Sequence, residues 1–140
     1  MDEKFSQTVK QIMGHDNRYR ADAYEFVNAA VTYTARKLER DCKPRGSRHV
    51  SGQELVEGTM DYAVIQFGFL APEVLEQWGV QQGEDVGNIV YNMIGAGLLS
   101  AGPEDSRKDF QCHPELITEL RQRIADAADF PEPPAPSVLD

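Results

Sequence analysis

The sequence is poor in the features that mark several protein classes. It has two cysteines, one tryptophan and no apolar run near the roughly 20 residues that a membrane-spanning helix needs. Cys42 and Cys112 lie far apart, and Met1 to Lys4 open no apolar signal-peptide core. We therefore expect two reduced thiols in a cytoplasmic protein without a membrane anchor. Lys and Arg number only 14 against 23 Asp and Glu, so the net charge of -9 disfavours a globally basic nucleic-acid-binding protein.

Motifs that carry catalysis or metal binding are also missing. The chain has no Gly-x-Ser-x-Gly, no phosphate-binding glycine loop and no His-Glu-x-x-His, so we predict no enzyme and no bound cofactor. Cys42, His49, Cys112 and His113 are zinc-ligand types. Their spacing does not match the usual chelating pairs, because one pair is too far apart and the other is adjacent. No metal site is predicted.

What the sequence does contain is helical periodicity. With 140 residues, 41% hydrophobic and 26% charged, the chain suits one ordinary domain. Apolar residues recur at helical spacing, and strand signals are nearly absent. The expected helices span about 2–13, 22–38, 51–67, 72–78, 84–96 and 114–128. This pattern predicts a mainly α fold, a compact bundle of five to six helices over residues 1–128. Four prolines predict a disordered tail over 129–140.

Local residue patterns indicate where these helices begin and end. Asp22 with Glu25, and Ser51 with Glu54, match the capping box, in which both side chains satisfy free backbone N–H groups. Glycines are expected to end helices at positions 14, 68, 79 and 97. Pro72 is expected to begin the short fourth helix. Trp78, on that helix, is expected to pack in the core.

The C-terminal half has the element order of a winged helix. Residues 71–79 and 84–96 would form the helix-turn-helix pair, and residues 98–112 would form a β-hairpin wing, although a plain loop is favoured for the last segment. The second helix offers Glu84 and Asp85 but no Lys or Arg, which disfavours contact with DNA phosphates. Winged helices also bind proteins. In a wing strand, Asp105, Arg107 and Asp109 would share one side and form a partner-binding edge.

A basic segment over residues 36–48 is the strongest electrostatic feature. Its six basic residues face only two acidic ones, Glu39 and Asp41. One interpretation is an anion site for RNA, phosphate or an acidic partner, built from Arg40, Lys43, Arg45, Arg48 and His49. The other is a solvated helix end whose charges complement the helix dipole and pair with the acidic surface. We favour the second interpretation.

An acidic stripe follows His49 along the third helix. Glu54, Glu57 and Asp61 recur at helical spacing, so with His49 they could form a general acid–base set or a metal patch. The alternative is a solvated helix face in which Glu54 serves as the cap. We favour the solvated helix face, because acidic stripes of this kind are usually exposed to water.

Several short segments between Arg18 and Phe110 carry a resemblance to a known family. They are Tyr19–Val27, Arg48–Gly58, Asp61–Ala63, Gln66–Gly68, Trp78–Val80, Glu84–Gly87, Gly97–Leu99 and Asp105–Phe110. In this order, over about two thirds of the chain, they resemble a bacterial family of uncharacterised proteins described as largely restricted to planctomycetes and verrucomicrobia. That family has no established activity, so the resemblance implies no catalytic or binding residue.

These observations lead to one functional hypothesis and one alternative. The size, the acidic surface and the proline-rich tail favour a non-catalytic protein-interaction or regulatory module whose partner is another protein. The alternative is a nucleic-acid-binding, winged-helix-like protein that uses the basic segment. The sequence does not indicate an oligomeric state.

Overall fold

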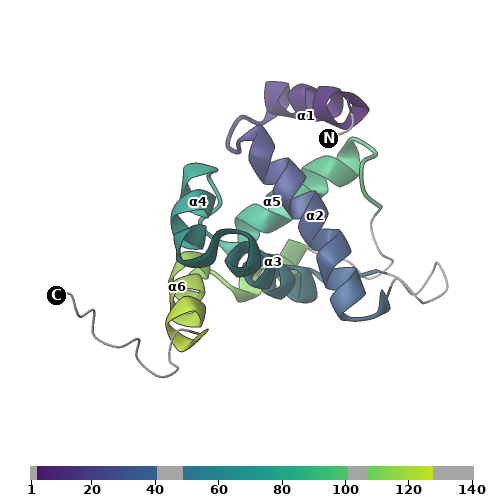
Figure 1. The fold of residues 1–140 in the computed structure, drawn as a ribbon. Coiled ribbons are helices and arrows are strands. Elements are labelled where there is room, and N and C mark those ends of the chain that lie inside the picture. Colours follow the sequence, from purple (N-terminus) through teal and green to yellow (C-terminus); the bar gives the residue numbers. More distant parts are fainter. Residues whose placement is uncertain (1–2, 41–48, 101–106, 128–140) are drawn as a thin grey trace.

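The computed structural model describes residues 3–40, 49–100 and 107–127, and they form an all-helical assembly (Figure 1). The α-helices are α1 (Glu3–His15), α2 (Ala21–Lys37), α3 (Gly52–Phe67), α4 (Ala71–Gln77), α5 (Gly83–Gly95) and α6 (Leu116–Ala127). Two short 3₁₀ helices, η3 (Gly68–Leu70) and η4 (Arg107–Cys112), complete the set. The predicted helical bundle is confirmed. The predicted tail over 129–140 lies outside the described residues.

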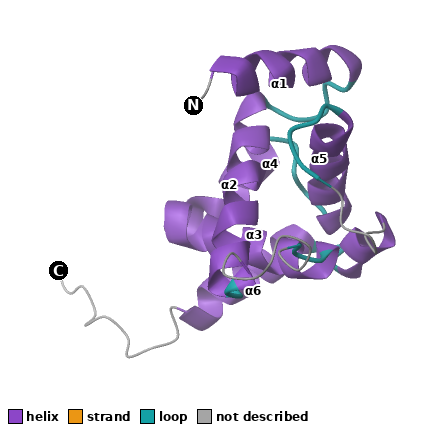
Figure 2. Ribbon diagram, turned by 90° about the vertical axis from the view of Figure 1, so that its right-hand side faces the viewer, coloured by secondary structure: helices purple, strands orange, loops and turns teal. Residues whose placement is uncertain are grey.

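The core forms where α2 crosses α3 and α5. Figure 1 shows α2 in front of α5, with α3 running beneath it, and Figure 2 shows α1 lying across the ends of α2 and α5. Tyr24 and Val27 of α2 are fully buried against Met60 of α3 and Met93 of α5. The apolar periodicity of each helix therefore faces one shared core.

The predicted β-hairpin over 98–112 is wrong for the residues that the structure describes there. No strand occurs among residues 98–100 and 107–112, and the latter form η4 instead (Figure 2). Phe110 explains this, because its ring is buried against Gly87 of α5 and Gly52 of α3. A Cβ atom at Gly87 would lie 2.7 Å from the Phe110 ring, so only glycine leaves room for it. Helices α4 and α5 exist as predicted, but the structure does not support a winged helix.

Some predicted helix ends are confirmed and others are wrong. The Ser51 and Glu54 capping box is present in both directions, and Gly68 ends α3 with a positive φ of 59°. Helix α2 instead begins at Ala21, after Arg20, without a side-chain cap. Asp22 and Glu25 are consequently left exposed, and Gly14 lies inside α1 rather than ending it.

None of the helices in the described ranges is both long enough and apolar enough to cross a lipid bilayer.

Candidate functional site

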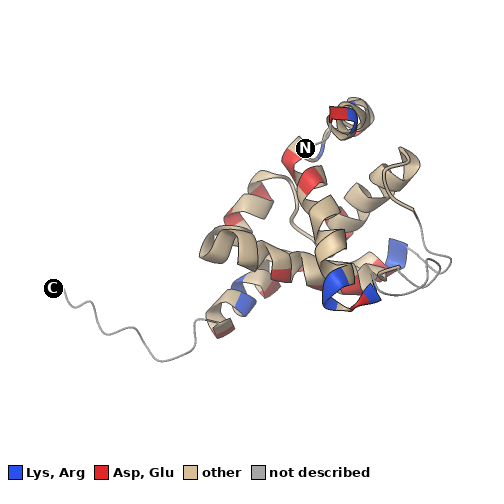
Figure 3. Cartoon of the chain, turned by 45° about the vertical axis from the view of Figure 1, so that its right-hand side comes forward, with Lys and Arg blue, Asp and Glu red and all other residues tan. Residues whose placement is uncertain are grey.

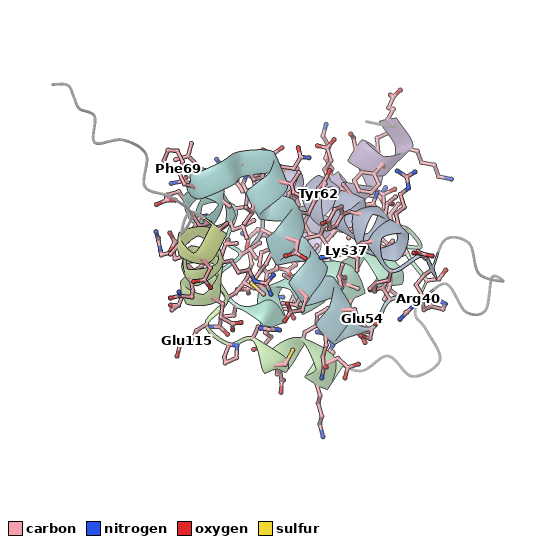
Figure 4. The ribbon with its side chains drawn as sticks, turned by 60° about the horizontal axis from the view of Figure 1, so that its bottom comes forward. Lys37, Arg40, Glu54, Tyr62, Phe69 and Glu115 are labelled. Carbon is pink, nitrogen blue, oxygen red and sulfur yellow. The ribbon has the colours of Figure 1, made fainter. Side chains whose placement is uncertain are left out.

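The structure describes only residues 36–40 of the basic segment 36–48. Two of its basic residues, Lys37 and Arg40, form ion pairs there. Lys37 donates to Asp61 at 2.5 Å, and Arg40 donates to Glu54 at 2.8 Å (Figure 4). Arg40 also donates to the backbone carbonyl of His49 at 2.8 Å. The remaining members of the predicted anion site, Lys43, Arg45 and Arg48, lie outside the described residues. The structure thus joins Arg40 to the backbone of His49 and to Glu54, so the Arg40 guanidinium is already engaged within the protein.

The acidic stripe of α3 is engaged by cations from other elements. Arg123 of α6 contacts Asp61 at 2.6 Å and also pairs with Glu57. The imidazole Nε2 of His113 lies 3.0 Å from Glu57, and its Nδ1 lies 2.7 Å from Glu119. Together with the pair of Lys37 and Asp61, these contacts tie α2, α6 and the segment before α6 to α3. The stripe is therefore a docking site for neighbouring helices.

Glu54 has a cap and a cation, and both act on its pKa. Burial opposes its ionisation, but the backbone N–H of Ser51 and the guanidinium of Arg40 outweigh that effect and hold the pKa of Glu54 below its ordinary value. A carboxylate held in its charged form by two donors is a poor proton shuttle at neutral pH.

His49 lies at a small apolar cavity of about 110 Å³ between α2, α3, α5 and η4. The lining side chains are mostly apolar, among them Leu55, Tyr91 and Phe110, with Ser100 as a further polar contributor. Among the described residues, no group of three or more His, Cys, Asp or Glu is arranged to hold a metal ion.

The two cysteines offer no nucleophile with a lowered pKa in the part of the chain that is described. Cys112 donates to the backbone carbonyl of Asp109 at 3.2 Å, and burial raises the pKa of its thiol. A raised pKa keeps sulfur in its less reactive thiol form. Cys42 lies outside the described residues.

The predicted partner-binding edge is also only partly placed. Arg107 stacks over the Tyr91 ring at 4.6 Å and donates to Asn88 at 3.1 Å. Arg107 and Asp109 belong to η4, and residues two apart in a 3₁₀ helix point in different directions. The side-by-side arrangement expected for a wing strand is therefore absent for this pair, and their role in partner binding stays a prediction. Asp105 lies outside the described residues.

An aromatic row that the sequence analysis did not identify runs along the α2–α3 surface. The row consists of five rings whose neighbouring centroids are separated by 5.1 to 5.6 Å. In order along the surface they are Tyr33, Tyr62, Phe26, Phe67 and Trp78. Phe26 is buried, whereas the other four rings are half-buried. Trp78 therefore packs on the core, as predicted, but at its edge. The contacting rings give this face a continuous apolar surface.

A separate apolar patch projects where α3 ends. Phe69 is 75% exposed, Ile65 61% and Leu70 52%, and Figure 4 shows Phe69 at the edge of the molecule. Gly68 ends α3 immediately before Phe69, and η3 then turns the chain into α4. The signal for this patch in the sequence is an apolar pair placed directly after a helix stop, outside the buried periodicity.

Polar side chains join the segment before α2 to α5. Asp16 accepts from Arg18 at 2.6 Å and from Asn92 at 2.9 Å, and Asn92 also donates to the Tyr24 hydroxyl. The hydrogen bonds from Arg18 hold the pKa of Asp16 far below its ordinary value, although partial burial opposes them. Burial raises the pKa of Tyr24. Asp16 therefore stays charged and Tyr24 neutral across the physiological range.

The lowered pKa of Asp16 predicts how stability depends on pH. A depressed folded-state pKa stabilises the protein above the unfolded value of about 3.9, and this contribution is lost as the pH falls below that value. We expect Asp16→Asn to have a lower free energy of unfolding than the wild type at pH 7. This difference between variant and wild type should be smaller at pH 3. Urea unfolding at both pH values measures this. Asp126→Asn, on the exposed face of α6, is the control. An equal gap at both pH values would show that the Asp16 charge contributes nothing.

No protein-family model, no curated protein and no solved structure matches this chain. The resemblance described above stays a prediction.

Proposed function

We propose that this protein is a non-catalytic protein-interaction module that works in the cytoplasm and that its partner docks on the apolar patch of Ile65, Phe69 and Leu70. The observation that carries the proposal is the exposure of Phe69, which leaves three quarters of a large aromatic side chain in water. Burying such a side chain in a partner would contribute about 1.5–3 kcal/mol. Large exposed aromatic residues are typical centres of protein interfaces.

The surroundings of the patch support a docking role. Helices α4 and α6 both contact η3 and therefore hold the patch in place. Arg121 of α6 pairs with Glu73 at 3.3 Å and with Glu76 of α4 at 3.6 Å. These exposed charges supply a polar rim near an apolar centre, which is the usual composition of a protein interface.

The use of the acidic stripe supports a non-catalytic role. Glu54, Glu57 and Asp61 each hold a cation from another element, so the hypothesis of acid–base catalysis with His49 lacks a free carboxylate among them. The same ion pairs weigh against the nucleic-acid alternative, because Lys37 and Arg40 are neutralised within the protein.

A capture experiment with matched variants tests the proposed surface. The tagged full chain is incubated with lysate of the source cells, with and without nuclease, and the eluates of wild type, Phe69→Ser and Leu38→Ser are quantified. Leu38 is the matched control, because it is also a large exposed hydrophobic residue, at 37%, but lies at the end of α2. We expect a stoichiometric partner that Phe69→Ser binds about thirtyfold more weakly, which corresponds to a loss of about 2 kcal/mol.

The control defines the contrary result. If Phe69→Ser retains the same partners as Leu38→Ser, the patch is not the docking surface. If the captured material is nucleic acid that nuclease removes, the module hypothesis yields to the alternative.

A further inference from the structure

The outer face of α2 is covered only at its edge, where Tyr62 of α3 packs against Tyr33. The residues that helix α2 buries are Ala23, Tyr24, Phe26, Val27, Ala30 and Thr34. Its opposite face presents positions 22, 25, 29, 32, 33 and 36, which recur at helical spacing. They line two adjoining surface hollows that share Ala29 and Tyr62.

Charge is distributed unevenly along this face. Asp22 and Glu25 line the hollow near the start of α2, and Arg36 lines the hollow near its end. Figure 3 shows the same division, with acidic residues at the α1 end of α2 and basic residues at the other. Within the described parts of the chain, these three side chains make no hydrogen bond or ion pair, whereas the adjacent Lys37 is held by Asp61. The face thus carries exposed charges of both signs that no described side chain pairs with.

The positions of these charges are symmetric about Ala29. Asp22 and Arg36 lie seven residues on either side of it, and Glu25 and Tyr33 lie four residues on either side. When two copies of a helix pack antiparallel about a two-fold axis, residues equally distant from the centre face each other. Asp22 would then face the partner subunit's Arg36, and Glu25 would face the hydroxyl of the partner subunit's Tyr33.

We propose that the outer face of α2 binds a second copy of this chain, in a symmetric homodimer with antiparallel α2 helices that cross at Ala29. The small side chain of Ala29 lets the two backbones approach at the axis. The charged pairs lie roughly 21 Å apart along the helix, so they fix both the register and the antiparallel direction. The half-buried rings of Tyr62 and Tyr33 beside Ala29 add apolar area to the interface.

A second copy is favoured over an unrelated helix because the face complements itself. Binding to an unrelated helix would require only that the charges on α2 match the charges on that helix. It would not require the acidic and basic residues of α2 to lie at equal distances from one small residue. The proposed dimer uses a face that is separate from the Phe69 patch. It therefore stands or fails independently of the proposed function.

Charge-reversal variants of the full chain test the dimer. The mass in solution is measured by sedimentation velocity at micromolar concentrations and physiological salt. We expect wild type to dimerise and both Asp22→Arg and Arg36→Asp to dimerise about tenfold more weakly or worse, because like charges then face each other. An equimolar mixture of these two variants should form a heterodimer, since every facing pair is again acidic with basic. The double variant should dimerise with itself.

Matched controls separate this interface from a general charge effect. Glu84→Arg and Lys10→Asp make the same charge changes at exposed positions of α5 and α1, and both are expected to dimerise like wild type. Phe69→Ser should also remain dimeric, and Ala29→Arg should be monomeric with an unchanged circular dichroism spectrum. A monomeric wild type overturns the proposal. So does a mixture of the two folded reversal variants that stays monomeric, or a dimer that only Phe69→Ser disrupts.

Discussion

Replacement of Gly58 by alanine is expected to lower the free energy of unfolding by about 2–3 kcal/mol, although alanine is the better helix former. A Cβ atom at this position would lie 1.8 Å from Oγ1 of Thr34 and 2.9 Å from its Cβ. Thr34 is 2% exposed and donates to the backbone carbonyl of Ala30 at 2.7 Å, so its side chain is held in place. Helices α2 and α3 must therefore separate where the core depends on their contact.

Other glycines of the chain supply the control for this prediction. Gly14 and Gly95 lie inside α1 and α5, and a Cβ atom at either would meet nothing within 4 Å. Alanine there should leave the free energy of unfolding unchanged or raise it by up to about 1 kcal/mol. Thr34→Ala combined with Gly58→Ala should recover most of the loss, because it removes the closest atom. Urea unfolding of the four variants measures these values. A Gly58→Ala protein as stable as Gly95→Ala would contradict the close helix approach.

The close approach at Gly58 illustrates which part of the fold the sequence predicts and which it does not. Apolar periodicity is a local property, and it places all six helices within a few residues of their observed bounds. The capping box of Ser51 and Glu54 is also local, since its donors and acceptors lie within one turn. Which glycine receives which side chain depends on packing between helices that are distant in sequence, and periodicity contains no such information.

The start of α2 shows how tertiary contacts override a local signal. Asp22 and Glu25 match a capping box, yet the helix already begins at Ala21. Tyr19 is buried and the backbone N–H of Arg20 donates to the carbonyl of Trp78 at 3.2 Å. Those contacts fix the preceding segment, and the helix starts where that segment ends.

The site differs from its sequence-based interpretation for a similar reason. Glu57 and Asp61 were expected to be either a solvated face or part of a catalytic set, whereas Arg123 reaches both from α6. A partner more than sixty positions away in the chain has no signature in the local pattern. The exposed pair Phe69 and Leu70 is different, because its place after the Gly68 helix stop is visible in the sequence.

Replacement of Gly79 by alanine is expected to cost about 3–4 kcal/mol of the free energy of unfolding. Two effects add at this position. Gly79 has a positive φ of 92°, which costs an L-residue roughly 1–2 kcal/mol. A Cβ atom would also lie 2.4 Å from the backbone carbonyl oxygen of Arg18, and backbone atoms have little freedom to move away.

Gly97→Ala separates these two effects. Gly97 has a similar φ of 82°, but nothing lies within 4 Å of a Cβ atom built there, so its replacement should cost only the conformational part, roughly 1–2 kcal/mol. Trp78 is the only tryptophan and precedes Gly79, so its fluorescence reports directly on this turn during urea unfolding. If both variants lose the same stability, the Arg18 carbonyl does not press on the turn.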